Sequence, residues 1–250
     1  MKRILIAGAL ALAAGGQALA ADLPQPAPPP PRAPATYVPA PVTLYNWTGF
    51  YIGGNLGGDW NQGSWSGTLG DTYGTSNTIK FLGGGQAGFN YEFGGGVVIG
   101  VEGDFEWGPN GSYTTTAAGG PLAGSTVTIN NSWLSTLTGR LGYAFDRVLV
   151  YGKGGGAWVG SSNSTIAFPG GGSFTPSASN SNYGWTVGAG IEWAFWGNVS
   201  AKLEYDYVGL NSQSFIVPAG TFAGVPTDTI TGSSRNIQML LVGLNYKFGY

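Results

Sequence analysis

The chain has 250 residues, of which 46 are glycine and 14% are aromatic, whereas charged residues make up only 9%. A soluble domain of ordinary composition has roughly 25% charged residues and about 7% glycine, so this chain has few charges for a water-facing exterior. It contains neither Cys nor His, which excludes disulfides, thiol nucleophiles, His-based zinc sites and Ser-His-Asp triads. Its net charge of −2 offers no basic patch for nucleic acid. The composition argues against an ordinary soluble enzyme and predicts no metal site, no cofactor and no nucleic-acid partner.

The N-terminus has the pattern of a secretory signal peptide over residues 1–20. Lys2 and Arg3 precede an apolar stretch over 4–14, and Ala18-Leu19-Ala20 provides small residues for cleavage. The apolar stretch is shorter than the roughly 20 residues that a transmembrane helix needs. We therefore expect an exported protein.

A proline-rich segment follows the predicted signal. Residues 23–41 hold nine of the fifteen prolines, which favours a semi-rigid extended spacer over a folded element. We interpret residues 21–46 as a periplasmic arm. It either contacts the cell wall or a partner, or merely separates the folded domain from the processing site.

Residues 47–250 alternate between apolar and polar side chains at period two, the period of β-strands. The pattern predicts eight strands, near 48–60, 80–93, 96–107, 131–145, 148–160, 182–195, 199–208 and 235–250. Tight connections at 94–95, 146–147 and 196–198 alternate with connections of about twenty residues near 61–79, 108–130, 161–181 and 209–234. Every proline beyond the arm lies in a long connection, so none interrupts a strand.

The location of the charges separates a soluble sandwich from a membrane barrel. A sandwich has its charged face in water, whereas a membrane barrel has its apolar face in lipid and its polar face in the lumen. The long connections carry only Asp71 and Asp228, and one tight turn holds Asp146 and Arg147. The remaining charges after the arm lie within strands, opposite the apolar face: Asp59, Lys80, Glu92, Glu102, Asp104, Glu106, Arg140, Lys153, Glu192, Lys202, Glu204, Asp206, Arg235 and Lys247. This distribution favours the barrel.

Aromatic residues support the same interpretation, because they gather at both ends of the predicted strands. Beside the tight turns or the C-terminus lie Tyr91, Phe93, Tyr143, Phe145, Trp193, Phe195, Tyr246 and Phe248. Beside the long connections lie Trp60, Phe81, Trp107, Trp133, Trp158, Tyr183, Trp185 and Tyr207. Two aromatic belts are typical of a protein that crosses both interfaces of a bilayer. The sequence predicts an all-β fold, an eight-stranded antiparallel transmembrane β-barrel.

Three segments resemble a known family. Residues 47–57 (WTGFYIGGNLG) and 151–158 (YGKGGGAW) are similar to the first and fifth strands of RopB-type outer-membrane proteins of alphaproteobacteria. The C-terminus resembles the signal that the barrel insertion machinery reads, here Gly243, Tyr246, Phe248 and Tyr250. Most members end at the Phe, whereas this chain continues for two residues. The resemblance implies an OmpA-like barrel in the outer membrane of a Gram-negative bacterium, with envelope-integrity and host-contact roles. It provides no catalytic residues.

The lumen of such a barrel is only wide enough for side chains to fill, whereas open diffusion channels use about 16–18 strands. We therefore expect the lumen charges to form a network of ion pairs and hydrogen bonds that plugs the barrel. The alternative is that they line a narrow path for ions. Paired carboxylates such as Glu102 and Asp104 also suggest acid–base catalysis, but strand alternation alone explains their spacing. We predict no enzymatic activity.

The long connections provide a further candidate site, because polar loops on a rigid scaffold often carry recognition. Either they only cover the barrel mouth, or their aromatic residues anchor a ligand or partner: Tyr113, Phe168, Phe174, Phe215 and Phe222. We interpret the chain as a non-enzymatic envelope-stabilising barrel with a surface available for host contact. The alternatives are a narrow pore for small solutes or ions, and an adhesin or ligand receptor. Expected partners are outer-membrane lipid, lipopolysaccharide and the barrel insertion machinery.

Overall fold

The computed structural model describes residues 44–73, 79–108, 112–175, 182–221 and 226–249. The chain divides into the units Met1–Val42 and Thr43–Tyr250, and the fold described below is that of the second unit. The predicted signal peptide and nearly all of the predicted arm lie outside the described residues. No helix in the described part of the chain is long and apolar enough to cross a membrane.

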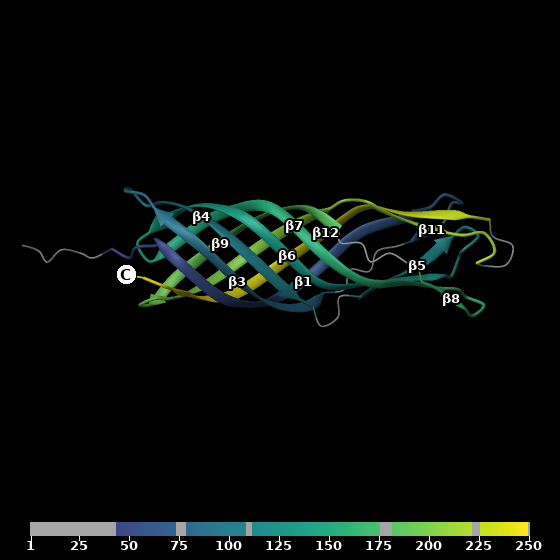
Figure 1. Cartoon of the computed structure of the whole chain (residues 1–250), viewed down its shortest axis with the longest axis horizontal. Coiled ribbons are helices and arrows are strands. Elements are labelled where there is room, and N and C mark those ends of the chain that lie inside the picture. Colours follow the sequence, from purple (N-terminus) through teal and green to yellow (C-terminus); the bar gives the residue numbers. More distant parts are fainter. Residues whose placement is uncertain (1–43, 74–78, 109–111, 176–181, 222–225, 250) are drawn as a thin grey trace, which may run out of the picture. The chain divides into compact units, whose positions relative to one another are not determined.

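Eight long antiparallel strands form a closed barrel (Figure 1). They are β1 (Gly49–Gly67), β3 (Lys80–Glu92), β4 (Val97–Trp107), β6 (Thr126–Phe145), β7 (Val148–Ala167), β9 (Asn182–Trp196), β10 (Val199–Leu210) and β12 (Asp228–Lys247). Each pairs with the next along the chain, and β12 also pairs with β1, where Lys247 lies opposite Tyr51. This last pairing closes the barrel and leaves it no free edge. The predicted fold class is confirmed.

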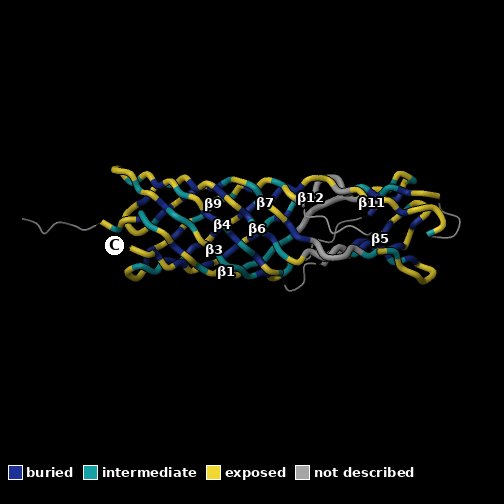
Figure 2. The backbone as a smooth tube through the Cα atoms, viewed as in Figure 1, coloured by how far each residue is buried: buried dark blue, intermediate teal, exposed yellow. Residues whose placement is uncertain are grey.

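The strands bury their polar residues and expose their apolar ones. On β10, Lys202 and Glu204 are almost fully buried, whereas the intervening Leu203 is 47% exposed. Figure 2 shows buried and exposed positions alternating along the barrel strands. Because successive side chains of a strand point to opposite faces, the charged positions lie inside and the apolar ones outside.

Tight turns connect the barrel strands at one end, where the C-terminus also lies (Figure 1). Three of them use left-handed backbone conformations: Gly95 and Gly96 at φ 99° and 86°, Asp146 at 55° and Gly197 at 48°. Such conformations suit the short turns that join twisted antiparallel strands, and glycine adopts them without steric cost. At this end the predicted strand limits agree with the structure to within one residue, except that β12 ends at Lys247 instead of at 250.

At the other end the strands run further than predicted. β1 and β7 each continue seven residues past the predicted limits of 60 and 160, while β6 and β12 begin at Thr126 and Asp228. Four short strands pair with these extensions: β2 (Thr72–Tyr73), β5 (Ser112–Gly119), β8 (Ser173–Phe174) and β11 (Gln213–Val217). The long connections were therefore wrongly predicted to lack strands. Their Ser-, Thr- and Gly-rich sequences have weak alternation, and pairing with a neighbour that already projects from the barrel extends the ladder.

These extensions enclose a small hydrophobic core of their own, here termed the loop core. Its buried members are Tyr73, Ala117, Leu122, Val127, Ile166, Phe168, Val217 and Ile230. Phe174 packs against it. Phe168 and Phe174 therefore stabilise the extension instead of presenting a binding surface. Tyr113, Phe215 and Phe222, the other predicted anchors, have side chains outside the described part.

Candidate functional site

Nine of the fourteen charged side chains assigned to the lumen lie together inside the barrel, in what is here termed the charged layer. They project from β4, β6, β7, β9 and β10, where each occupies an inward-facing position. All nine are buried: Glu102, Asp104, Glu106, Arg140, Lys153, Glu192, Lys202, Glu204 and Asp206. Because every second side chain of these five strands points inward, residues far apart in sequence meet in one cluster.

Lys153 on β7 lies at the centre of the charged layer. Its Nζ is 2.8 Å from Glu204 Oε1 and 3.3 Å from Glu102 Oε1. Asp104 Oδ2 and Asp206 Oδ2 also lie 3.3 Å from the same nitrogen. One ammonium group therefore contacts four carboxyl groups, which belong to β4 and β10. Because a buried charge is costly unless it is paired, Lys153 holds together two strands that are not neighbours in the sheet.

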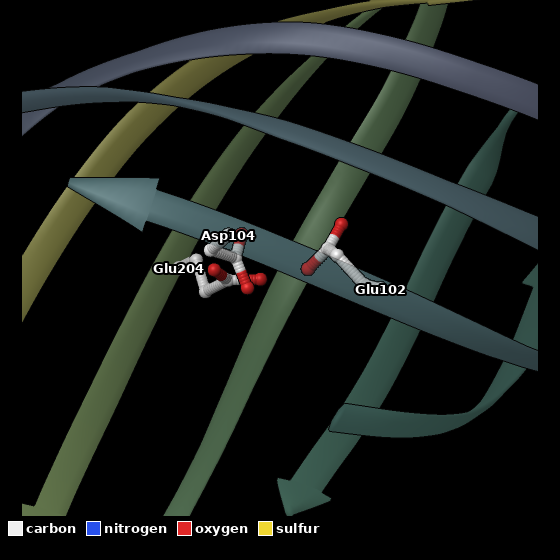
Figure 3. Close-up of side chains that lie close together, drawn as sticks. All are labelled: Glu102, Asp104 and Glu204. Carbon is white, nitrogen blue, oxygen red and sulfur yellow. The ribbon is translucent and has the colours of Figure 1, made fainter. Parts of the chain in front are cut away.

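Three carboxylates of the charged layer lie near enough to one another to suggest a metal centre (Figure 3). One oxygen each of Glu102, Asp104 and Glu204 lies within 4.8 Å of the others. Carboxylate oxygens are the ligands that hard cations prefer. However, Lys153 contacts all three residues, and Lys202 Nζ is 3.2 Å from Glu204 Oε1 and 3.6 Å from Glu102 Oε1. Two fixed ammonium groups supply the positive charge that a metal ion would otherwise provide.

Arg140 on β6 forms the second centre of positive charge. Its Nη1 is 3.2 Å from Glu102 Oε2 and its Nη2 is 3.1 Å from Glu192 Oε2. The guanidinium lies over the ring of Tyr151, 3.8 Å from the centroid, in a cation–π arrangement. It also donates to the hydroxyl of Tyr51, which in turn donates to Glu102 Oε2 at 2.8 Å. The Tyr51 hydroxyl thus extends the network to β1, and the Tyr151 hydroxyl donates to Glu204 Oε2 at 2.6 Å.

Neutral amides satisfy carboxylate oxygens of the charged layer that form no ion pair with Arg140, Lys153 or Lys202. Asn55 Nδ2 donates to Glu106 Oε1 at 2.7 Å, and Asn245 Nδ2 donates to Glu192 Oε1 at 2.8 Å. Gln86 bridges them, since it accepts from Asn55 and donates to Asn245. The sequence analysis missed these three amides because it considered only charged residues. Their inward-facing position on β1, β3 and β12 is the signal that could have found them.

Two glycines make room for the tyrosines of this network. A Cβ atom built on Gly190 would lie 2.5 Å from the hydroxyl oxygen of Tyr151, closer than real Cβ atoms approach such a group. A Cβ atom on Gly88 would likewise clash with the hydroxyl group of Tyr51. The absence of side chains at these positions lets both rings lie across the neighbouring strands.

Two apolar clusters flank the charged layer along the barrel. The loop-side apolar layer consists of Leu82, Leu134, Ala157, Val159, Val208, Leu210, Ile237, Met239 and Leu241. The turn-side apolar layer consists of Trp47, Val98, Ala144, Leu149, Tyr151 and Ala194. All these side chains are buried. The charged layer therefore lies between two apolar layers, with little access to water.

The segment before β1 covers the barrel mouth at the tight-turn end. Trp47 is buried, its Nε1 donates to the carbonyl oxygen of Asp146 at 2.9 Å, and its N–H donates to Glu92 Oε2 at 2.8 Å. Tyr45 N–H donates to Asp146 Oδ1 at 2.8 Å. Burial raises the pKa of Tyr45 to about 12, against the opposing effect of the Arg147 guanidinium 5.8 Å from its ring. The phenol therefore stays neutral at physiological pH.

The five other predicted lumen residues lie outside the charged layer. Glu92 and Lys247 are at the covered mouth, where Lys247 Nζ donates to a backbone carbonyl before β1. Asp59 and Lys80 lie opposite each other in the β1–β3 pairing, toward the loop end. The side chain of Arg235 is outside the described part. Sequence alternation thus identified the inward face, but not which inward residues meet.

The residues of the predicted insertion signal lie at the end of β12. Tyr246 and Phe248 are exposed on the outer surface, with ring centroids 5.2 Å apart. Gly243 lies opposite Asn55 in the β12–β1 pairing, and Tyr250 is outside the described residues. Recognition by the insertion machinery stays a prediction.

Both predicted aromatic belts lie on the barrel. All eight residues of the turn-side belt are exposed, and they pair along each strand, with Tyr91–Phe93 and Tyr143–Phe145 centroids both 4.8 Å apart. In the loop-side belt, Trp185 and Tyr207 lie 5.5 Å apart. Exposed Leu, Ile and Val side chains occupy the outer surface between the belts. Such a surface suits a lipid bilayer with its two interfaces.

Comparison with known proteins agrees with this geometry. A family model described as outer membrane protein beta-barrel domain matches residues 8–248. The chain belongs to this family. It is 34% identical to a 31 kDa outer-membrane immunogenic protein of Brucella melitensis, over 99% of this chain and all of the relative. It is 32% identical to a 22 kDa outer membrane protein of Rhizobium leguminosarum, over 80% of this chain and 79% of the relative.

A solved structure shows the same fold. The outer membrane protein OprG of Pseudomonas aeruginosa superposes with a TM-score of 0.56 at 15% identity, over 83% of this chain and 99% of OprG. The predicted family and location are therefore confirmed: this is an outer-membrane β-barrel protein of a Gram-negative bacterium, similar to alphaproteobacterial outer-membrane proteins. Barrels of this kind place short turns in the periplasm and long loops outside the cell.

Proposed function

We propose that the protein is a non-enzymatic, non-conducting barrel that stabilises the outer membrane and presents its long loops at the cell surface. The observation that carries the proposal is the filled interior. The charged layer is cross-linked by Lys153 and Arg140 and lies between two apolar layers. Such an interior supports a stable structural element, because each buried charge has partners and neither apolar layer favours passage of ions.

The same burial argues against catalysis in the lumen. Glu102 and Asp104 share one strand face, as paired catalytic carboxylates would, but both are buried and bound to lysine. A catalytic acid or base must come within hydrogen-bond reach of its substrate. The flanking apolar layers oppose the approach of a polar substrate to these groups.

Expected partners follow from the two surfaces. The apolar exterior and its aromatic belts suit outer-membrane lipid and lipopolysaccharide, and the end of β12 suits recognition by the barrel insertion machinery. We also propose that the Pro-rich arm reaches the cell wall. The curated relatives of Brucella are named as immunogenic proteins, which supports exposure of the loops of this chain to the host.

The alternative function, a narrow pore, is tested by single-channel recording of the refolded mature protein in a planar bilayer. We expect no discrete openings from protein that migrates as a folded barrel before heating. Reproducible openings whose ion selectivity changes in Arg140→Gln would overturn the plugged interior. Openings unchanged in that variant would also contradict a closed barrel, and would place the path away from the charged layer.

Surface contact is tested separately, by cutting back the four long connections. Binding of purified wild-type protein to host cells is compared with binding of the shortened barrel, whose folding is checked by its migration before heating. We expect binding to fall with the loops. Equal binding by both proteins would remove the adhesin and host-contact roles and leave the structural role alone.

A further inference from the structure

Two buried aspartates meet in the extension beyond the barrel, although they lie far apart in sequence. Asp71 is in the turn between β1 and β2, and Asp228 is the first residue of β12. Both are 0% exposed. The four long connections contain no Lys or Arg, so they provide no base to compensate these acids.

The Oδ1 atom of each aspartate binds a neighbouring turn. Asp71 Oδ1 accepts from the backbone N–H of Leu122, in the turn between β5 and β6, at 2.8 Å. Asp228 Oδ1 accepts from Thr68 Oγ1 at 2.7 Å and from the N–H of Leu69 at 3.3 Å, both in the β1–β2 turn. The two side chains thus join the β1–β2 turn, the β5–β6 turn and the start of β12.

The Oδ2 atoms receive no hydrogen bond from any described donor. Both lie beside Gly67, where a Cβ atom would be 2.6 Å from Asp228 Oδ2 and 3.1 Å from Asp71 Oδ2. Two carboxylates that share a buried site repel each other when both are ionised. A positive charge between the two oxygens removes this repulsion.

The surroundings favour a proton over a metal ion. A calcium ion takes six to eight oxygen ligands, whereas Asp71 and Asp228 offer two unpartnered side-chain oxygens among the residues that the structure describes. The titratable group of the adjoining β2 is Tyr73, whose hydroxyl pairs with Ser125 Oγ at 3.5 Å. The β5–β6 turn contributes no titratable side chain, and the adjoining loop core is otherwise apolar. One proton satisfies both oxygens, because the protonated carboxyl group donates its O–H to the carboxylate oxygen of the other.

We propose that Asp71 and Asp228 share one proton, and that this shared proton is a clasp that keeps the three connected elements closed at the outer surface. The inference goes beyond the proposed function, since it holds whatever the loops contact. When the proton is lost, two adjacent buried charges repel, and the turns separate to hydrate them. The surface loops are then closed at low pH and loosened as the pH rises.

The direction of titration agrees with this geometry. Burial raises the pKa of the Asp71 carboxyl group and the charge of Asp228 raises it further, while the Leu122 N–H opposes both. A carboxyl group whose pKa is raised by folding contributes stability below its ordinary pKa and loses that contribution as the pH rises through the raised value. The clasp therefore opens with increasing pH.

Hydrogen–deuterium exchange of the refolded mature protein tests the clasp. Wild type and Asp71→Asn are compared in the same metal-free buffers at about pH 4 and about pH 8, so that intrinsic exchange cancels. Between the two pH values we expect protection of residues 67–73 and 120–124 to fall severalfold in wild type relative to the variant. In Asp71→Asn the amide donates permanently to Asp228, so its protection should match that of acidic wild type at both pH values.

Three results would overturn the proposal. They are equal pH dependence in wild type and Asp71→Asn, undiminished wild-type protection at the higher pH, and protection at the higher pH that returns only when calcium or magnesium is added. The last would make the pair a metal site. Asp228→Asn provides a second variant that should remove the pH dependence in the same way. Residues 199–208 of β10 serve as an internal control and should stay equally protected throughout.

Discussion

The charged layer and the extension beyond the barrel both bury carboxyl groups, but the two regions neutralise these groups differently. In the charged layer, Lys153 alone contacts four carboxylates, and Arg140 contacts two. In the extension beyond the barrel, Asp71 and Asp228 lie beside each other and accept hydrogen bonds from neutral donors. A fixed cation keeps its charge over the whole physiological range, whereas a shared proton depends on pH. The positive charge in the membrane-embedded region is thus constant over the physiological pH range, whereas the positive charge in the exposed region changes with pH.

The largest effect is expected from Lys153→Met. Removing the ammonium group leaves four buried carboxylates without their common partner, which should lower the free energy of unfolding by about 3–5 kcal/mol. Denaturant titration in detergent, followed by tryptophan fluorescence, measures the loss. Adding Glu204→Gln to this variant should restore part of the stability, because it removes one of the uncompensated charges. Additive losses in the double variant would show that the two residues are not coupled.

Trp47→Ala should have the next largest effect. It should lower the free energy of unfolding by about 3 kcal/mol, because it leaves a cavity in the turn-side apolar layer. Trp47→Phe is the matched control, since it keeps an aromatic ring but removes the Nε1 donor to Asp146 and part of the ring volume. The control should lose about 1 kcal/mol. The same denaturant titration applies, and equal losses in the two variants would mean that the hydrogen bond, not the packing, secures the mouth.

Ile230→Ala separates the two regions. The side chain is fully buried in the loop core, so its truncation should weaken the extension by about 2–4 kcal/mol. We expect chymotrypsin to cleave the loops faster, while denaturant unfolding of the barrel changes little. Leu240→Ala on the exposed barrel surface is the control for general effects and should leave loop cleavage unchanged. A matching loss of barrel stability in Ile230→Ala would show that the regions unfold as one.

The smallest effect concerns pH. Because the pKa of Asp71 is raised, the opening free energy of the extension should fall as the pH increases through that raised value. Chymotrypsin cleavage rates, normalised to cleavage of an unfolded substrate at each pH, measure this change. The barrel should show no parallel trend in denaturant titrations over the same range. A barrel that weakens in step with the loops would remove the contrast between fixed and shared positive charge.

The comparison also shows where sequence reasoning succeeds. Lys202, Glu204 and Asp206 alternate with Leu203 and Tyr205, and strict alternation leaves only two faces to assign. The tight-turn ends of the strands were equally predictable, because Gly95, Gly96 and Gly197 mark left-handed turns. Neutral residues such as Gln86 escaped notice because only charged residues were considered, although Gln86 occupies an inward-facing position of β3.

By itself, the sequence determined the architecture and its inside and outside. Period-two alternation, charges confined to one face and paired aromatic belts are local signals, because they depend only on neighbours along one strand. Contacts across the lumen are not local. The approach of Lys153 to β4 and β10, and of Asp71 to Asp228, depends on barrel closure and on the pairing register of strands distant in sequence. Only the tertiary structure decided which buried charges have a cation and which share a proton.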